Sequence, residues 1–200
     1  MLPWAMATPL DPFIPKPDVR ERFHTTIQAP AAIVLDVAGN FDLQSLLGVW
    51  IIFRLREKLM RSAPSEPRKP RGLVSEMRDL GWGLLAEEPG RFLVYGAVTQ
   101  PWKAQVTFTP IPANEFAEYA EPNQVKIAWT LEAEALGPAT TRFSHETRAV
   151  ATDAEARKRF RRYWRWARFG IIAIRLLLLP AIRRTAERRW SAQRILPRGR

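Results

Sequence analysis

Residues 125–178, VKIAWTLEAEALGPATTRFSHETRAVATDAEARKRFRRYWRWARFGIIAIRLLL, contain two strand patterns followed by the pattern of one long helix. Apolar residues alternate along 125–133, and a turn at 136–139 leads into a second strand at 141–151. The Thr-Asp pair at 152–153 can cap the helix that follows. The apolar residues of this helix recur at steps of three and four, which predicts one continuous stripe. The stripe consists of Phe160, Trp164, Ala167, Ile171, Ile174 and Leu178.

The residues before this region add a first strand, short helices and further strands. Two strand patterns, at 82–87 and 91–98, flank the turn sequence Glu88-Pro89-Gly90 and indicate a hairpin. The other predicted elements are a strand at 19–28, helices at 30–38 and 43–60, a proline-rich loop at 62–70, helical turns at 73–80, and short extended segments at 105–109 and 115–119. No helix pattern separates the later strands, so we expect them to pair antiparallel.

This order of elements predicts an α+β fold. A curved antiparallel β-sheet wraps on the long C-terminal α-helix, and two short helices follow the first strand. An antiparallel sheet needs cover for its apolar face, and the long helix is the element large enough to provide it. We expect residues 1–18 to form an extended arm, 19–189 a single domain, and 190–200 a basic tail. A cavity is expected between the sheet and the helix.

Four segments carry a resemblance to a known family. They are GWGLLAEEPGRFLVYGAV (81–98) with Trp102, FAEYAEPNQVKIAWTLEAE (116–134), HETRAVATD (145–153) and RKRFRRYWRWARFG (157–170). Together with the order of elements they resemble the START-like superfamily, also called SRPBCC or helix-grip, and more narrowly a bacterial branch of it. The resemblance implies the helix-grip fold over about 19–189. It leaves the function open, because the superfamily includes lipid carriers, polyketide cyclases and ligand sensors. That branch usually has Thr where this chain has His145.

The composition excludes several kinds of site. The chain has no Cys, so it has no disulfide framework, no thiolate metal site and no Cys nucleophile. Its two histidines, His24 and His145, are too few for a multi-histidine metal centre. No GxSxG, GxGxxG or GxxxxGK motif is present, which disfavours a hydrolase or an NTPase. We therefore predict no metal site and no cofactor.

Aromatic residues on the predicted strands and helix can line a pocket. The candidates for ligand binding are Tyr95, Trp129, Phe143, His145, Tyr163 and Trp164. Aromatic walls with a few polar tips suit a small hydrophobic or amphipathic ligand that is lipid-like or polyketide-like. Ordinary core packing uses the same residues at the same spacing. The enzymatic alternative is a cyclase or dehydratase reaction with His145 or Tyr95 as the acid or base.

The strand that carries His145 also carries two charged residues. Alternation places His145 with Phe143 and Thr147 on one face, and Glu146 with Arg148 on the other. His145 either orients a ligand oxygen inside a cavity or is a hydrogen-bonded histidine of the sheet without a ligand. The structural alternative for Glu146 and Arg148 is an ion pair that holds the sheet to a loop.

Basic residues are concentrated in the last quarter of the chain. Residues 151–200 contain 15 basic and three acidic residues, whereas residues 1–150 contain 16 and 17. Arginine and aromatic residues alternate along 157–168, so an anionic membrane surface is a candidate partner. Nucleic acid is disfavoured, because the apolar stripe of the same helix is needed to cover the sheet. A solvated helix face is the simplest alternative.

The apolar segment 169–182 is too short to cross a membrane. Its length as a helix is about 21 Å, against about 30 Å of hydrocarbon. It also contains Arg175 and Pro180, which disfavour insertion. We expect a buried helix or one that lies in an interface. The N-terminus lacks the pattern of a secretory signal, so the expected location is cytoplasmic, with a peripheral position at the membrane as the alternative.

Overall fold

The computed structural model describes residues 8–42 and 72–195 of the 200-residue chain. In chain order its elements are β1 (Val19–Ile27), α1 (Ala31–Gly39), α3 (Leu73–Asp79), β2 (Gly83–Glu88), β3 (Phe92–Thr99), β4 (Phe108–Thr109), α4 (Ala113–Phe116), β5 (Val125–Gly137), β6 (Thr140–Ala151) and α5 (Ala154–Ile195). The helix predicted at 43–60 and the loop predicted at 62–70 lie outside the described residues.

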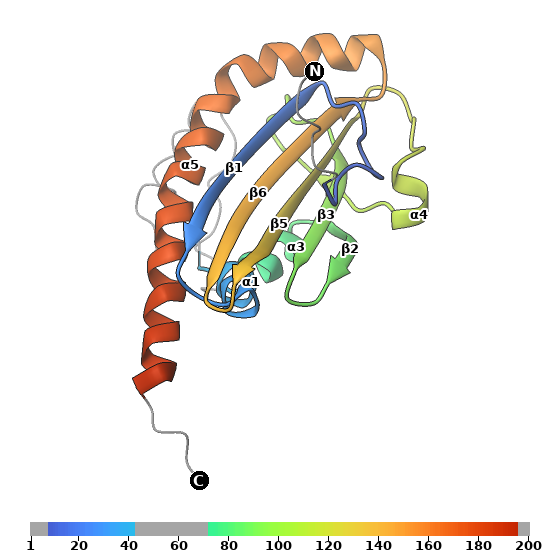
Figure 1. The fold of residues 1–200 in the computed structure, drawn as a ribbon. Coiled ribbons are helices and arrows are strands. Elements are labelled where there is room, and N and C mark those ends of the chain that lie inside the picture. Colours follow the sequence, from blue (N-terminus) through green and yellow to red (C-terminus); the bar gives the residue numbers. More distant parts are fainter. Residues whose placement is uncertain (1–7, 43–71, 196–200) are drawn as a thin grey trace, which may run out of the picture.

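The strands form one curved antiparallel sheet (Figure 1). Its order is β1-β6-β5-β3-β2, and β4 pairs with the end of β3. The longest strands, β5 and β6, are joined by a tight turn and pair along almost their whole length. The antiparallel sheet and the β2–β3 hairpin are confirmed, because apolar alternation and short turns leave these segments few other ways to pair. With α5 packed against it, the sheet forms the α+β helix-grip architecture.

The long C-terminal helix is confirmed. The carboxylate of Asp153 accepts a hydrogen bond from the N–H of Ala156 at 2.7 Å, as expected of a helix cap. From Ala154 the helix continues for 42 residues to Ile195, past the boundary predicted at residue 190. Figure 1 shows α5 bending around the sheet: its first part passes over one end of the strands and its second part runs along β1.

The predicted apolar stripe packs on the sheet at both of its ends. Near the start of α5, Phe160 is buried against sheet residues that include Val125 and Ala149. Further along the helix, Leu178 is buried in the main core with inward residues of the sheet and with α1. Between these two anchors, the stripe residues Trp164, Ala167, Ile171 and Ile174 are only half-buried.

The N-terminal segment packs on the opposite face of the sheet, and its prediction as an extended arm is wrong for residues 8–14. The N–H groups of Asp11 and Ile14 bond back to Thr8 and Leu10, which makes consecutive turns. These turns bury Leu10 and Ile14 against the sheet, next to Phe116 of α4. Apolar burial therefore fixes a segment whose prolines suggested an extended chain.

Two short extended segments also differ from the prediction. Residues 115–119 were expected to be extended, but Ala113–Phe116 form the helical turn α4 after Pro112. The reason is tertiary, because the turn places the side chain of Phe116 in the apolar cluster on the sheet's outer face. The strand expected at 105–109 is limited to Phe108 and Thr109.

Candidate functional site

The candidate site lies on the concave face of the sheet, beneath α5. Tyr95 of β3 and Trp129 of β5 are direct partners across the strands, and their rings stack with centroids 5.1 Å apart. Trp129 also meets the ring of His145 on β6 edge to face, at 6.1 Å. Trp82 approaches the other side of Trp129 at 6.2 Å. The inward positions of three neighbouring strands thus form one aromatic surface.

The hydroxyl of Tyr95 is anchored from outside the sheet. The Nε of Arg78, on α3, donates a hydrogen bond to the Tyr95 hydroxyl at 3.0 Å. The same guanidinium lies 5.7 Å from the centre of the Tyr95 ring. Because Tyr95 is completely buried, this bond satisfies its polar end and fixes the ring against Trp129.

His145 is held in one tautomer. Its Nδ1 lies 2.8 Å from the backbone oxygen of Thr130, and a carbonyl oxygen can only accept, so Nδ1 carries the proton. Burial, together with the charge of Arg175, lowers the pKa of His145 to about 3, although the bond to Thr130 raises it. His145 is therefore neutral near pH 7, and its Nε2 is a hydrogen-bond acceptor. A pKa this low makes it a poor general base.

Arg175 of α5 reaches down to the same face. Its side chain is 6% exposed, its Nη2 donates to the Thr147 hydroxyl at 2.7 Å, and its guanidinium lies 5.4 Å from the ring centre of Phe23. Its Nη1 is buried and has no hydrogen-bond partner among the described residues. Burial lowers the pKa of Arg175 to about 10, while the charge of Glu21 raises it, so the group stays protonated at pH 7.

The residues around Arg175 are not fully covered. His145, Thr147 and Phe23 on the sheet are half-buried, and so are Ile171 and Ile174 on the stripe of α5 that faces it. In a completely packed layer these inward residues would lose nearly all of their exposed surface. These residues between the middle of α5 and strands β1 and β6 therefore keep part of their surface exposed beside a buried cation.

The structure brings four of the six predicted site residues together. Tyr95, Trp129 and Phe143 belong to one core cluster, and His145 contacts Trp129. The other two, Tyr163 and Trp164, pack in a separate cluster with Phe160 at the start of α5. Arg175 is not among the residues predicted for the site. The available signal was a single arginine within the apolar stretch 169–182.

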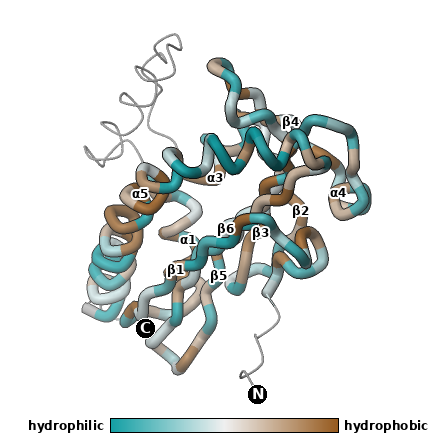
Figure 2. Tube along the Cα trace, turned by 90° about the horizontal axis from the view of Figure 1, so that it is seen from above, coloured by the Kyte–Doolittle hydropathy of each residue, from teal (hydrophilic) through white to brown (hydrophobic). Residues whose placement is uncertain are grey.

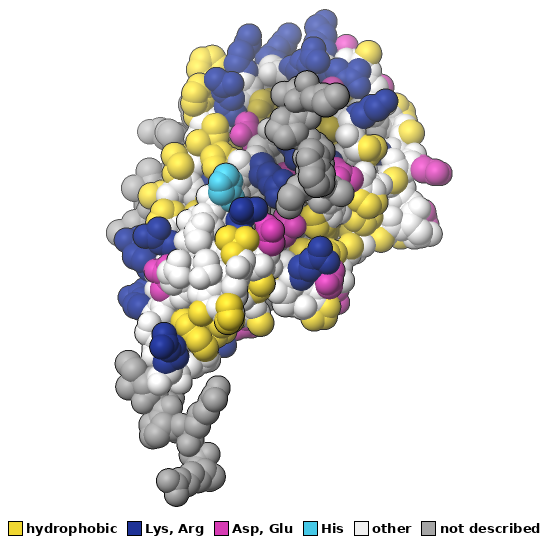
Figure 3. Space-filling model, viewed as in Figure 1, with side chains coloured by type: hydrophobic (Ala, Val, Ile, Leu, Met, Phe, Trp, Pro, Cys, Tyr) yellow, Lys and Arg dark blue, Asp and Glu magenta, His cyan; other side chains and the backbone are white. Residues whose placement is uncertain are grey.

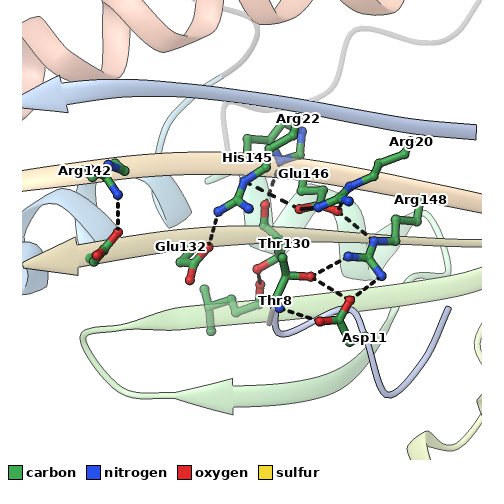
Figure 4. Close-up of polar contacts among 12 residues, drawn as sticks. Thr8, Asp11, Arg20, Arg22, Thr130, Glu132, Arg142, His145, Glu146 and Arg148 are labelled. Carbon is green, nitrogen blue, oxygen red and sulfur yellow. Dashed lines mark hydrogen bonds and ion pairs between the residues drawn. The ribbon is translucent and has the colours of Figure 1, made fainter. Parts of the chain in front are cut away.

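The charged residues of β6 belong to the opposite face (Figure 4). Glu146 and Arg148 are almost completely buried, and the Arg148 Nε donates to Glu146 at 2.7 Å. Arg148 also donates to the Ile14 carbonyl at 2.8 Å and to the Thr8 hydroxyl at 2.7 Å, and pairs with Asp11 at 2.7 Å. The structural alternative for this pair is confirmed, since it ties the sheet to the N-terminal turns.

Residues 8–42 and 72–195 contain no group of three or more His, Asp or Glu residues arranged to hold a metal ion. Over the same ranges, no helix combines the length and the apolar character that crossing a bilayer requires.

The tautomer and burial of His145 predict a dependence of stability on pH. The unfolded chain takes up the proton near pH 6.5 and the folded chain only near pH 3, so stability is lost as the pH falls between these values. From pH 6.5 to 5 the loss attributable to His145 is roughly 1.5 kcal/mol. Urea unfolding at these pH values should show a smaller loss for His145→Gln than for the unmodified protein. The variant His24→Gln, at an exposed position, is the matched control. Equal losses in all three proteins would contradict the burial of His145.

Comparisons with known proteins found only distant structural likeness. No protein-family model and no curated protein matches the chain. The ZhuI aromatase/cyclase from Streptomyces sp. R1128 is 15% identical, with a TM-score of 0.32 over 86% of this chain and 94% of its own. The protein DR_A0006 from Deinococcus radiodurans is also 15% identical, with a TM-score of 0.29 over 76% of this chain and 99% of its own. Both TM-scores are low, and the chemistry of this chain has to be read from its own residues.

Proposed function

We propose that this protein binds a small amphipathic ligand between the sheet and α5. The ligand has an apolar body, lipid-like or polyketide-like, and an anionic end such as a carboxylate. The body lies against the half-buried residues Phe23, Ile171 and Ile174, and the anionic end meets Arg175. The single observation that carries the proposal is a guanidinium that is 6% exposed and leaves Nη1 without a partner among the described residues.

The buried positive charge of Arg175 is the reason to expect an anionic end on the ligand. A buried charge is costly unless it is paired and its hydrogen bonds are made. Arg175 has one hydroxyl partner, and within the described ranges no carboxylate lies within ion-pair distance of it. A carboxylate is the group that a guanidinium binds best, through two parallel N–H···O bonds. The neutral His145 adds an acceptor for a hydroxyl on the ligand.

The apolar body supplies most of the affinity. A ligand that buries roughly 300 Å² of apolar surface gains about 7 kcal/mol before ordering costs. After those costs we expect dissociation constants no lower than about micromolar. Such an affinity suits a carrier or sensor of an abundant molecule.

The test compares decanoate with decanol, which share a chain and differ in the charged end. Titration calorimetry at neutral pH should show that decanoate binds the unmodified protein about ten to one hundred times more tightly, because bonds to a charged group contribute about 1.5–3 kcal/mol. Arg175→Met should remove this difference and leave decanol binding unchanged. The control is Arg159→Met, an exposed arginine of the same helix that pairs with Glu155.

The stability of the variant separates a binding role from a structural one. Arg175→Met should unfold at the same or a higher urea concentration, because methionine keeps the apolar stem and removes a buried charge with an unfilled donor. Equal binding of decanoate and decanol by the unmodified protein would overturn the proposal. Unchanged decanoate binding by Arg175→Met, or no binding of either probe by the folded protein, would overturn it as well.

A further inference from the structure

We propose that the outer face of α5 docks the protein on an anionic lipid surface. Four large apolar side chains on this face, here called the outer strip, point away from the sheet: Trp166, Phe169, Leu176 and Leu177, with exposed fractions of 74, 58, 61 and 41%. Their successive spacings of three, seven and one residues keep them along one side of the helix. They lie opposite Arg175, Leu178 and Ile182, which the same helix buries toward the sheet.

Exposed arginines flank the outer strip at both ends. Before it lie Arg161, Arg162 and Arg165, and after it lie Arg183, Arg184 and Arg188; Arg168 lies between Trp166 and Phe169, and all seven are exposed. Figure 2 shows the same arrangement along α5, where a hydrophobic stretch separates two hydrophilic ones. In Figure 3, basic side chains gather along the top of the molecule, over the first part of α5, beside exposed hydrophobic ones.

The length of the outer strip suits the convex middle of α5 resting on a membrane. The outer strip from Trp166 to Leu177 covers about 16 Å, and the arginines extend the basic face to about 40 Å. Interfacial helices combine an apolar side, often with Trp and Phe, and arginines that reach anionic head groups. Because α5 bends around the sheet, its outer face is the convex side of the bend (Figure 1).

The composition of this face favours lipid over other occupants. A second copy of the chain would bring two sets of arginines together, and between residues 161 and 188 the sequence offers one acidic residue, Glu187, which lies 4.0 Å from Arg183. Nucleic acid would pair with the arginines, but phosphates and bases gain little from the aliphatic Leu176 and Leu177. An anionic bilayer can bind both the arginines and the outer strip. Its head groups pair with the arginines, and its acyl boundary accepts the apolar side chains.

The test is sedimentation of the full chain with vesicles of phosphatidylcholine, with and without phosphatidylserine. We expect the protein to sediment with the anionic vesicles only. Binding should fall steeply between about 0.1 M and 1 M salt, where the Debye length shrinks from about 10 to 3 Å. Arg162→Gln/Arg165→Gln should weaken binding about fivefold per arginine. Trp166→Ser/Phe169→Ser should weaken it by about tenfold or more, through lost apolar contact.

Matched controls carry the same changes away from α5. Arg91→Gln/Arg142→Gln removes two exposed charges, and Leu84→Ser/Leu136→Ser removes two exposed apolar side chains. Both controls should bind vesicles like the unmodified protein. No sedimentation at low salt, equal losses in controls and outer-strip variants, or a dimer that the outer-strip variants dissociate would each overturn the proposal. Binding of single-stranded DNA through the same arginines, without vesicle binding, would overturn it in favour of nucleic acid.

Discussion

Replacing Arg148 by methionine is expected to lower the free energy of unfolding by about 3–5 kcal/mol, because the change leaves a carboxylate buried without its closest partner. Glu146 is 1% exposed and Arg148 is 2% exposed, so water cannot replace the lost bond. Arg20 at 2.8 Å and Arg22 at 3.6 Å still pair with Glu146, but both side chains are partly exposed and offset only part of the loss. The bonds of Arg148 to Ile14 and Thr8 are lost as well.

Urea unfolding followed by circular dichroism measures this loss. The double variant Glu146→Gln/Arg148→Met should recover a large part of it, because no unpaired charge stays buried. The control Arg142→Met removes an exposed arginine of the same strand and should change stability by less than about 1 kcal/mol. Hydrogen exchange should show that residues 8–14 open first in Arg148→Met. A loss no larger than that of the control would contradict the described network.

Replacing Phe143 by alanine should also cost about 3–5 kcal/mol, the range for a buried aromatic side chain in a packed core. Phe143 is completely buried on β6, in the cluster that joins the sheet to Leu178 and Ile182 of α5. The ring therefore connects the two layers that define the fold. Phe143→Leu keeps most of the apolar volume and should cost considerably less, near 1 kcal/mol.

The two variants together test whether α5 lies on the concave face. Chemical unfolding gives both stabilities, and the slope of the free energy against urea should stay constant if the native state keeps its compactness. If Phe143→Ala costs less than about 1 kcal/mol, then Phe143 does not lie in the layer between the sheet and α5. Leu136→Ala, at an exposed position near the β5–β6 turn, serves as the control and should be nearly neutral.

The regular elements of the fold could be predicted from the sequence because their apolar residues recur at a fixed spacing along the whole element. The apolar spacing repeats at least three times in each of β5, β6 and α5. The cap residue Asp153 marks the point where the strand spacing ends and the helix spacing begins. The short helix α4 has four residues and no period. Its conformation is set by the burial of Phe116, which depends on residues far away in the sequence.

The site could be predicted only in part, for related reasons. Alternation places Trp129 and His145 on inward positions, but the pairing of Trp129 with Tyr95 depends on the register of β3 against β5. Trp164 belongs to the helical stripe and Tyr163 precedes it, and both pack with Phe160 in the cluster at the start of α5, apart from the cluster of Trp129. An arginine in a helix is usually exposed to solvent. The burial of Arg175 depends on the strands beneath it, so its position in the sequence does not by itself predict a role in the site.

A crystal structure of the protein with decanoate, at a concentration that saturates binding, tests the amphipathic-ligand proposal most directly. We predict that a carboxylate oxygen lies within about 3 Å of Nη1 of Arg175, with the chain along Phe23, Ile171 and Ile174. Decanoate bound elsewhere, with Nη1 still unpaired beneath α5, would contradict it.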